Sequence, residues 1–408
     1  TGAWQKTLNY AGKPGFCPTG TVWYSITTQG GGATTQQCID VVGRAIRSIS
    51  TSINDKMIFV DQYYDTSGRP ERVSEPYFEG DYPHWNETEY DVAGRVTRLQ
   101  SAGIEVLNTS YDEQATNSCT LAGPGVIVTT NALDQKTVEV KNVLGETEES
   151  FDDSCGRVSF DHDSMGYLSR VTGVNGSSVR MSYDGAGRKI SQSDPDKGSW
   201  QYAYNAFGEL TRQLDNKKQA IDFEYDALGR VTNRRELSGV DSLGDSFFTI
   251  VNRETTSYRT LSPGKSQVAT VTYRSGNSGA ESHKVVSSYD WLGRVEGIET
   301  TVNQQQFYQQ TTYDAYGRVF QHFDASGDSR GVRYAYRNGH LSELKEAREG
   351  VQGVVYQSVL NMDARGNVTL AELGNGVTAY AEYDPANGHL VSLSAYNQYD
   401  VELQNVAY

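Results

Sequence analysis

Two short motifs of this 408-residue sequence place a serine hydroxyl beside a carboxylate, as a hydrolytic nucleophile would require. They are Gly244-Asp245-Ser246-Phe247 and Gly327-Asp328-Ser329. Such a nucleophile also needs an ordered histidine and acid, on a sharp turn between a strand and a helix. Neither motif has these partners, so both are interpreted as turn residues. The sequence therefore assigns no catalytic residue and predicts a protein that is not an enzyme.

The histidines and acidic residues form no recognisable metal motif. Histidines occur without HxH or HExxH spacing, and no CxxC pair offers a structural zinc site. The histidines are His84, His162, His283, His322, His340 and His389. Asp161-His162-Asp163 and Asp194-Pro195-Asp196 could hold Ca²⁺, but both lack the regular ligand alternation of a calcium loop. We therefore expect no metal and no cofactor.

The charge balance argues against two classes of partner. The chain has 36 basic and 51 acidic residues and a net charge of −15, whereas nucleic acids and anionic lipids bind basic faces. No run of about 18 apolar residues occurs, so we expect no membrane span. The 41 glycines and 27 tyrosines, with 37% hydrophobic residues, indicate many turns, aromatic-rich strands and a thin core.

A hexapeptide of the form Tyr-Asp-x-x-Gly-Arg recurs along the chain. The full copies are Tyr64-Asp65-Thr66-Ser67-Gly68-Arg69, Tyr90-Asp91-Val92-Ala93-Gly94-Arg95, Tyr183-Asp184-Gly185-Ala186-Gly187-Arg188, Tyr225-Asp226-Ala227-Leu228-Gly229-Arg230, Tyr289-Asp290-Trp291-Leu292-Gly293-Arg294 and Tyr313-Asp314-Ala315-Tyr316-Gly317-Arg318. Degenerate copies lie at 39–44, 204–209 and 362–367. The period is set by glycines spaced 21 residues apart, namely Gly145, Gly166, Gly187, Gly208 and Gly229.

Each copy predicts a tight turn between two strands. Tyrosine favours strands, and an Asp followed three positions later by Gly suits a type I turn in which Gly takes a positive φ. The Asp and Arg are expected to bond to the turn or to each other. A second turn lies half a period on, so one repeat holds two strands of about five or six residues. The predicted fold is all-β: tandem hairpins forming one continuous, curved antiparallel sheet, as a spiral shell or strip.

The array is predicted to be continuous, with two irregular stretches. Residues 1–38 form a turn-rich β lead-in or a divergent repeat. Residues 39–237 and 283–408 carry the repeats, and 238–282 carry degenerate repeats with longer loops. Because the chain begins Thr1-Gly2-Ala3-Trp4, it is interpreted as a piece of a longer protein.

Four cysteines leave two alternatives open. Cys17, Cys38, Cys119 and Cys155 permit two disulfides in a secreted protein, or four independent thiols. Cys17 and Cys38 are one repeat length apart, so adjacent strands could bring their sulfur atoms together.

The Tyr-Asp-x-x-Gly-Arg copies resemble the YD repeats of the RHS (rearrangement hotspot) family, over about residues 39–390. This family includes bacterial polymorphic toxins, the B and C components of insecticidal toxin complexes, and the animal teneurins. The resemblance implies a β-sheet strip that spirals into a hollow shell around a C-terminal toxic domain. The tract 69–78 is similar to bacterial members, so the resemblance favours a bacterial protein that is secreted or lies at the cell surface.

One departure from the family pattern shapes the functional prediction. RHS shells end in a core segment rich in Asp-Pro-x-Gly, of which Tyr383-Asp384-Pro385-Ala386-Asn387-Gly388 is only a faint echo. We therefore expect a structural wall segment whose partners are the rest of the parent polypeptide: a cargo or toxin domain and a capping segment. The alternative is a surface adhesin that binds a glycan or a protein through aromatic residues such as Trp85, Trp200 and Trp291.

Overall fold

The computed structural model describes residues 5–112, 124–276, 279, 281–326, 330–348 and 353–408. These residues form 34 β-strands in one sheet and no helix. None of the described segments could therefore cross a membrane as a helix. The predicted all-β fold of tandem hairpins in an antiparallel sheet is confirmed.

The strands follow one another at short intervals along the chain. The first ten are β1 (Gln5–Ala11), β2 (Trp23–Gln29), β3 (Thr35–Ile39), β4 (Ala45–Thr51), β5 (Met57–Tyr64), β6 (Pro70–Ser74), β7 (Tyr77–Phe78), β8 (Trp85–Tyr90), β9 (Val96–Ser101) and β10 (Ile104–Tyr111). The next sixteen are β11 (Val126–Asn131), β12 (Lys136–Lys141), β13 (Thr147–Phe151), β14 (Arg157–His162), β15 (Leu168–Thr172), β16 (Ser178–Tyr183), β17 (Lys189–Asp194), β18 (Gly198–Tyr204), β19 (Leu210–Asp215), β20 (Gln219–Tyr225), β21 (Val231–Ser238), β22 (Thr249–Tyr258), β23 (Val268–Ser275), β24 (Glu281–Tyr289), β25 (Val295–Val302) and β26 (Gln305–Tyr313). The last eight are β27 (Val319–Phe323), β28 (Gly331–Arg337), β29 (His340–Ala347), β30 (Val355–Met362), β31 (Val368–Leu373), β32 (Thr378–Tyr383), β33 (Leu390–Tyr396) and β34 (Glu402–Ala407).

Hairpin pairing sets the register. Neighbours in chain order pair antiparallel, as β16 does with β17 and β24 with β25. Near β5 the order branches, because β5 pairs with both β6 and β7 and β6 pairs with β8. The pairing shifts by one residue beside the motif tyrosine, for example between Ser182 and Tyr183. The same shift occurs beside Tyr64, Tyr90, Tyr225 and Tyr289. Such a bulge bends the strand and increases its twist.

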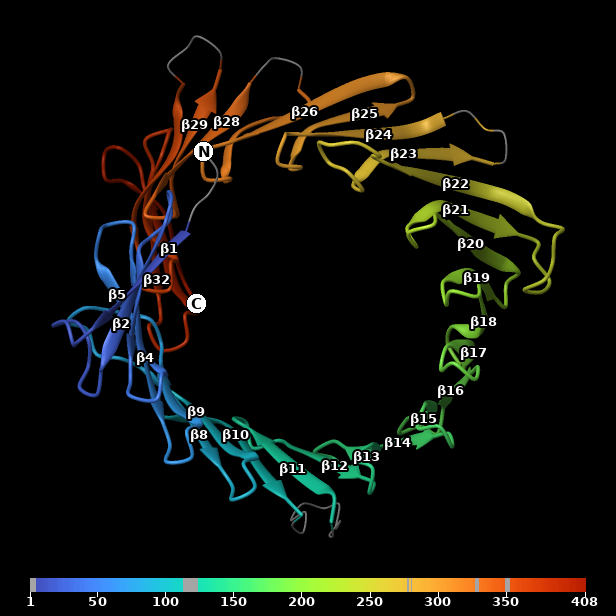
Figure 1. The fold of residues 1–408 in the computed structure, drawn as a ribbon, viewed down its shortest axis with the longest axis horizontal. Coiled ribbons are helices and arrows are strands. Elements are labelled where there is room, and N and C mark those ends of the chain that lie inside the picture. The colour runs from blue at the N-terminus through green and yellow to red at the C-terminus, as the bar shows by residue number, and fades with distance from the viewer. Residues whose placement is uncertain (1–4, 113–123, 277–278, 280, 327–329, 349–352) are drawn as a thin grey trace. The chain divides into compact units, whose positions relative to one another are not determined.

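The chain divides into two compact units. Unit 1 comprises residues 1–109, 130–134 and 311–408, and unit 2 comprises 110–129 and 135–310. Within unit 1, the N-terminal hairpins (blue) and the C-terminal hairpins (red) lie in the same region of the fold (Figure 1), and β4 meets β29 where His340 Nε2 lies 3.2 Å from the Thr51 carbonyl oxygen. Polar contacts join them: Asn54 Nδ2 donates to Asn361 Oδ1 at 2.7 Å.

Burial is concentrated in three small clusters, consistent with the thin core that the composition predicts. One lies around Cys38 and Phe59 in unit 1. Two lie in unit 2, around Val138 and around Leu237. Because a hairpin alone buries little apolar surface, neighbouring hairpins stabilise one another.

Candidate functional site

The repeated turn closes through its aspartate. In the copy at 183–188, Asp184 Oδ1 accepts the N–H groups of Ala186 and Arg188, both at 2.9 Å, and Oδ2 accepts Arg188 Nε at 2.7 Å. The Gly187 N–H donates to the Asp184 carbonyl at 3.0 Å. Gly187 has φ +80°, a conformation that costs glycine least. One carboxylate thus holds both arms of the turn.

All six full copies carry the same ion pair. The carboxylates are 13–23% exposed and the arginines 26–43%. The pairs are Asp65–Arg69, Asp91–Arg95, Asp184–Arg188, Asp226–Arg230, Asp290–Arg294 and Asp314–Arg318. In each copy the glycine has a positive φ, at Gly68, Gly94, Gly187, Gly229, Gly293 and Gly317.

The turn bonds lower the pKa of these aspartates. For Asp184 the main cause is the N–H of Arg188, with the guanidinium adding to it. For Asp91 and Asp226 the main cause is the hydrogen bond from the paired guanidinium. Bonds to the charged form favour it, so all three carboxylates remain ionised to lower pH than an ordinary aspartate.

The motif arginine also reaches the next copy along the chain. The Arg188 guanidinium lies over the Tyr204 ring, 5.0 Å from its centroid, and Nη1 donates to the Asn205 carbonyl at 3.1 Å. In return the Tyr204 hydroxyl donates to the Lys189 carbonyl at 2.8 Å. We call this reciprocal contact the inter-repeat lock.

The lock recurs where the sequence keeps both partners. Arg69 lies 4.4 Å from the centroid of Tyr90, whose hydroxyl donates to Pro70 at 2.8 Å. Arg230 lies 4.1 Å from the centroid of Tyr258. The motif tyrosines Tyr64, Tyr183, Tyr225 and Tyr289 also donate their hydroxyls to backbone carbonyls of an earlier hairpin. A ring over a guanidinium adds about 0.5–1 kcal/mol at an exposed site.

The degenerate copy at 39–44 keeps the ion pair, between Asp40 and Arg44, whereas other degenerate turns replace it with another bonded pair. In the copy at 204–209 an asparagine takes the place of Asp and a glutamate the place of Arg. Asn205 Oδ1 still accepts two turn N–H groups, and its Nδ2 donates to Glu209 Oε2 at 2.6 Å. Asn142 and Glu146 repeat this arrangement. In these two turns both positions differ from Asp and Arg, and the side-chain bond across the turn is kept. In the copy at 362–367 only the second position differs, and Asn367 Nδ2 donates to Asp363 Oδ2 at 2.9 Å.

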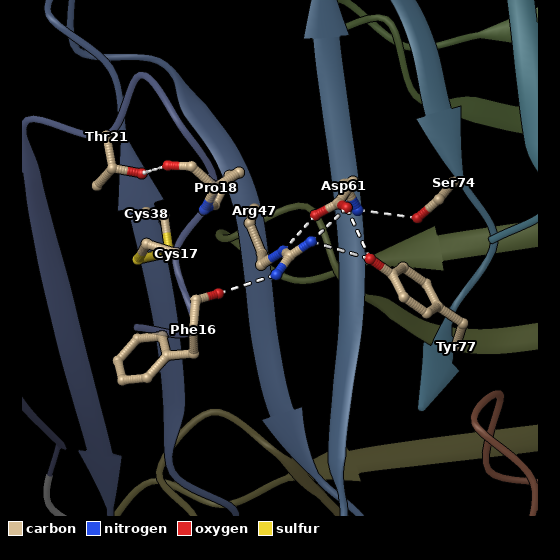
Figure 2. Close-up of polar contacts among 9 residues, drawn as sticks. All are labelled: Phe16, Cys17, Pro18, Thr21, Cys38, Arg47, Asp61, Ser74 and Tyr77. Atoms are coloured by element: carbon tan, nitrogen blue, oxygen red, sulfur yellow. Dashed lines mark hydrogen bonds and ion pairs between the residues drawn. A yellow bond between two sulfur atoms is a disulfide. The ribbon is translucent and has the colours of Figure 1, made fainter. Parts of the chain in front are cut away.

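A second type of arginine site, which the sequence did not reveal, lies on the sheet face of unit 1. Arg47 on β4 stands opposite Asp61 on β5 and binds it through two nitrogens, at 2.5 and 2.6 Å. Nη1 donates to the Phe16 carbonyl at 2.9 Å, so the guanidinium also holds the loop above the sheet. The Tyr77 hydroxyl donates to Asp61 at 2.7 Å (Figure 2). We call this set the Arg47 patch.

Unit 2 repeats the arrangement with other residues. Arg212 on β19 stands opposite Asp222 on β20 and binds it at 2.5 and 2.8 Å. Nη1 donates to the carbonyls of Leu243 and Asp245, at 3.0 and 2.8 Å, in the loop between β21 and β22. This is the Arg212 patch. In both patches the charged residue lies two positions along its strand from a buried apolar residue, as Arg212 does from Leu214. This spacing places both side chains on the same face of the sheet, and it is the only indication of the patch that the sequence contains.

Two of the four cysteines lie beside the Arg47 patch. Cys17 and Cys38 form a disulfide, with Cα atoms 5.7 Å apart, between the loop and β3 (Figure 2). Cys155 is also disulfide-bonded, and Cys119 lies outside the described residues.

Three aspartates from the motifs considered for catalysis or metal binding serve as turn residues, whereas Asp161 and His162 lie on β14. Asp245 accepts the N–H groups of Asp241 and Phe247 and so closes its own loop. Asp163 and Asp194 likewise accept turn N–H groups. The described residues contain no group of three or more His, Cys, Asp or Glu placed for a metal ion. The motif at 327–329 lies outside the described residues.

The tryptophans considered for ligand stacking lie in three different settings. Trp85 packs between Arg72 and Tyr63. Trp200 donates its indole N–H to the Lys197 carbonyl at 3.2 Å. Trp291 sits in a motif turn and is 75% exposed.

Comparison with known proteins identifies the fold. No known family profile and no curated protein sequence matches this chain. The crystal structure of TcdB2-TccC3 matches with a TM-score of 0.78 and 16% identity, covering 99% of this chain and 23% of that one. Two others match at TM-score 0.76 and 16% identity, each covering 95% of this chain and 22% of theirs. They are TcdB2-TccC3 without its hypervariable C-terminal region, and the Photorhabdus luminescens Tc holotoxin pore with a mutated TccC3.

This chain therefore spans less than a quarter of the length of the structures it resembles. The similarity extends over nearly all of it, and one antiparallel sheet of hairpins accounts for the match. The resemblance to RHS-repeat proteins that the motifs indicate is confirmed in the fold.

Proposed function

We propose that this chain is a non-catalytic wall segment of a secreted bacterial RHS-repeat protein, enclosing a C-terminal toxin or other cargo domain of its parent polypeptide. The inter-repeat lock is the observation that carries the proposal. The recurring polar residues bond to their own turn and to the next hairpin, as in Arg188 with Tyr204. Residues that are used in this way build a surface and leave little chemistry for a substrate.

The fold supports the same reading. TcdB2-TccC3 is a toxin complex with this fold, and the similarity covers 95–99% of the chain in three of its structures. The Cys17–Cys38 disulfide suits an oxidising compartment outside the cytosol. In a wall of this kind the strands shield the cargo from proteases and solvent, and a capping segment elsewhere in the parent protein closes the enclosure.

The test is limited proteolysis of the full-length parent protein. We expect a domain C-terminal to this segment to survive digestion while the wall is intact. Gly187→Val with Gly229→Val forces valine into positive φ at two motif turns, and should make that domain cleavable. Gly185→Ala, in the same turn but with open space around its Cβ, is the control. Equal digestion of the domain in parent and double variant would overturn the containment proposal.

A further inference from the structure

One joint between neighbouring copies in unit 2 has no inter-repeat lock, because its arginine is missing. The copy at 204–209 ends in Glu209 where a full copy has its motif arginine, and the next copy begins with Tyr225. The Tyr225 hydroxyl still donates to the Leu210 carbonyl, at 2.7 Å. Among the described residues, however, no cationic side chain or second aromatic ring lies against the Tyr225 ring.

Other joints show what normally covers a motif tyrosine. At Tyr90 and Tyr204 the arginine of the preceding copy lies over the ring. At Tyr183 the preceding copy supplies Tyr167 in place of an arginine, and the two ring centroids are 5.1 Å apart. The preceding copy therefore covers the ring at these joints, whereas it leaves the ring of Tyr225 uncovered.

The Glu209 carboxylate lies where the guanidinium of a complete lock would lie. A Cβ on Gly229 would be 2.9 Å from Glu209 Oε1. In the complete lock at Tyr90, a Cβ on Gly94 would be 3.5 Å from Arg69 Nη1. Because Glu209 Oε2 accepts a hydrogen bond within its own turn, Oε1 is the oxygen that faces the next turn.

The exchange of arginine for glutamate leaves acceptors without a donor. In a complete lock, Nη1 of the arginine donates to a backbone carbonyl of the next turn, as Arg188 does to Asn205 at 3.1 Å. A carboxylate cannot donate, so the equivalent carbonyl of Asp226 lacks this donor, and Glu209 Oε1 adds a further acceptor at the same turn. A positively charged donor placed between the two copies would satisfy both oxygens.

An open pocket lies between these two copies. Its volume is about 760 Å³, which is enough for a side chain or a small ligand. The rings of Phe207 and Tyr225 form apolar walls, and three carboxylates also line it. Glu224 and Asp226 are each paired with an arginine, so Glu209 is the lining carboxylate that has no cationic partner among the described residues.

The chemistry of these walls favours a planar cation. Burial, and to a smaller extent the Glu209 charge, raise the pKa of Tyr225, so the carboxylate acts on the tyrosine across the pocket. The face of an aromatic ring attracts a cation, and a carboxylate binds one through charge-assisted hydrogen bonds. A guanidinium meets both requirements, as Arg188 does over Tyr204.

We propose that the pocket between Glu209 and Tyr225 binds a guanidinium group on an aliphatic stem, as in an arginine side chain from outside this joint. The guanidinium lies over the Tyr225 ring, binds Glu209 Oε1 and donates to the Asp226 carbonyl. The stem packs against Phe207. The ligand thus supplies the arginine that the sequence omits at this joint. The inference does not depend on whether the sheet encloses a cargo.

A guanidinium can reach this pocket from two sources. It can belong to a free small molecule or to an arginine elsewhere in the parent polypeptide. The recognition chemistry is the same in both cases. The 408-residue chain therefore tests the site, and the full-length parent protein tests the source.

Isothermal titration calorimetry of the chain with N-acetylarginine amide tests the site. We expect a dissociation constant of about 1 mM, consistent with one ion-paired side chain. The citrulline analogue has the same shape without the charge and should bind about tenfold more weakly. The lysine analogue should also bind more weakly, because an ammonium does not stack on a ring or form paired hydrogen bonds. Equal affinities for the three probes would overturn the proposal.

Matched variants separate the pocket from the overall negative charge. Glu209→Gln and Glu146→Gln each remove one charge from the same type of turn, but only Glu209 lines the pocket. Glu209→Gln should weaken binding of the arginine probe about tenfold, and Glu146→Gln should leave it unchanged. Equal losses would show that the probe responds only to the net charge of −15, and would overturn the site.

Restoring the arginine should fill the pocket from within the chain. Asn205→Asp with Glu209→Arg gives this copy the ion pair that Asp184 and Arg188 form. We expect the double variant to lose binding of the probe and to unfold at a higher temperature, because it gains a lock. Far-ultraviolet circular dichroism confirms that the sheet is retained. A folded double variant that binds the probe as the unaltered chain does would overturn the proposal.

The same titration of the full-length parent protein identifies the source. Binding that persists there assigns the pocket to a free ligand. Binding that is lost there assigns it to an arginine of the parent polypeptide, and benzoylphenylalanine at position 207 should then crosslink to a segment that carries an arginine. Crosslinks only to segments without arginine would overturn the proposal.

Discussion

The buried patches and the repeated turns use the same ion pair for different purposes. In the Arg212 patch the arginine and aspartate are 12% and 9% exposed, and the remaining guanidinium donors hold a loop. In the neighbouring motif turn, Arg230 and Asp226 are 27% and 23% exposed, and the guanidinium reaches the next hairpin. Burial makes the first pair costly to break, whereas the second pair mainly fixes geometry.

The two patches differ from each other in one covalent bond. The loop over Arg47 is joined to β3 by the Cys17–Cys38 disulfide. The loop over Arg212 has no cysteine and is held by hydrogen bonds and by the buried Val240, which is 1% exposed. The same polar anchor therefore serves with and without a covalent link.

Removing the buried carboxylate should have the largest effect. Asp222→Ala leaves the Arg212 charge buried without its bidentate partner, which costs about 3–5 kcal/mol of unfolding free energy. Urea denaturation measures the loss. Asp226→Ala in the adjacent motif turn is the matched control, and should move the midpoint far less. Equal shifts for the two variants would show that burial does not separate the two types of pair.

Loss of the disulfide should distinguish the two patches. Cys17→Ser with Cys38→Ser frees the loop of unit 1 and is expected to cost about 3 kcal/mol for a closed loop of this size. Hydrogen exchange should rise at 12–22 and stay unchanged at 239–248, where the loop carries no disulfide. Unchanged exchange at 12–22 would mean that Arg47 alone holds the loop.

A motif glycine should matter more than its neighbour in the same turn. Gly187→Val places a β-branched side chain at φ +80°, with its Cβ 2.4 Å from the Tyr167 hydroxyl. We expect a loss of about 2 kcal/mol in thermal or urea unfolding. Gly185→Ala, which meets nothing within 4 Å, should be neutral. A parent-like Gly187→Val would contradict the assigned turn.

Weakening one inter-repeat lock should have a smaller effect on stability, and the effect should appear in the next hairpin along the chain. Arg188→Lys keeps the charge but loses the planar group over Tyr204, at a cost of about 0.5–1 kcal/mol. Hydrogen exchange at the Asn205 turn, one hairpin ahead, should increase. Arg180→Lys on the exposed side of β16 is the control. An effect confined to the 183–188 turn would argue that the arginine acts only locally.

Acid should produce the smallest and most gradual change. The pKa of Asp184 lies below its unfolded value because turn N–H groups and Arg188 bond the carboxylate. A lowered folded pKa gives stability that is complete above pH of about 4 and is lost as pH falls through the folded pKa. The urea midpoint should therefore be flat from pH 7 to 5 and decline below about 4. A decline already complete by pH 5 would exclude the motif aspartates as its cause.

The repeated turn was predictable because its determinants are consecutive. Asp, Gly and Arg of one motif meet within six residues, so their bonds depend on local sequence alone. The strand β29 was also predictable, although Leu341, Leu344 and Ala347 share a spacing of three. A spacing of three is typical of a helix, but in a row of hairpins each turn is followed by a strand. Residues His340–Ala347 accordingly form β29, which pairs with β28.

The contacts between hairpins could not be predicted in this way. Arg188 meets Tyr204 only because the bulge and register of two hairpins place them together. Arg47 and Asp61 belong to no motif, and cross-strand register alone sets them opposite one another. Arg47 and Asp61 each lie two positions from a buried apolar residue, Ile49 and Phe59, and so share its face of the strand. This was the only sequence pattern that could have indicated a buried ion pair, but exposed strands show the same pattern.

The inter-repeat lock has a consequence for how such a chain can change length during evolution. Each lock requires only that the tyrosine of the next copy lie against the preceding motif arginine. The length of chain between the two residues can vary. Arg230 meets Tyr258 just as Arg188 meets Tyr204, although a long excursion precedes Tyr258. An insertion between the two partners, such as residues 239–248, therefore need not break the contact between arginine and tyrosine. Lengthening by such steps would require no redesign of the surrounding chain.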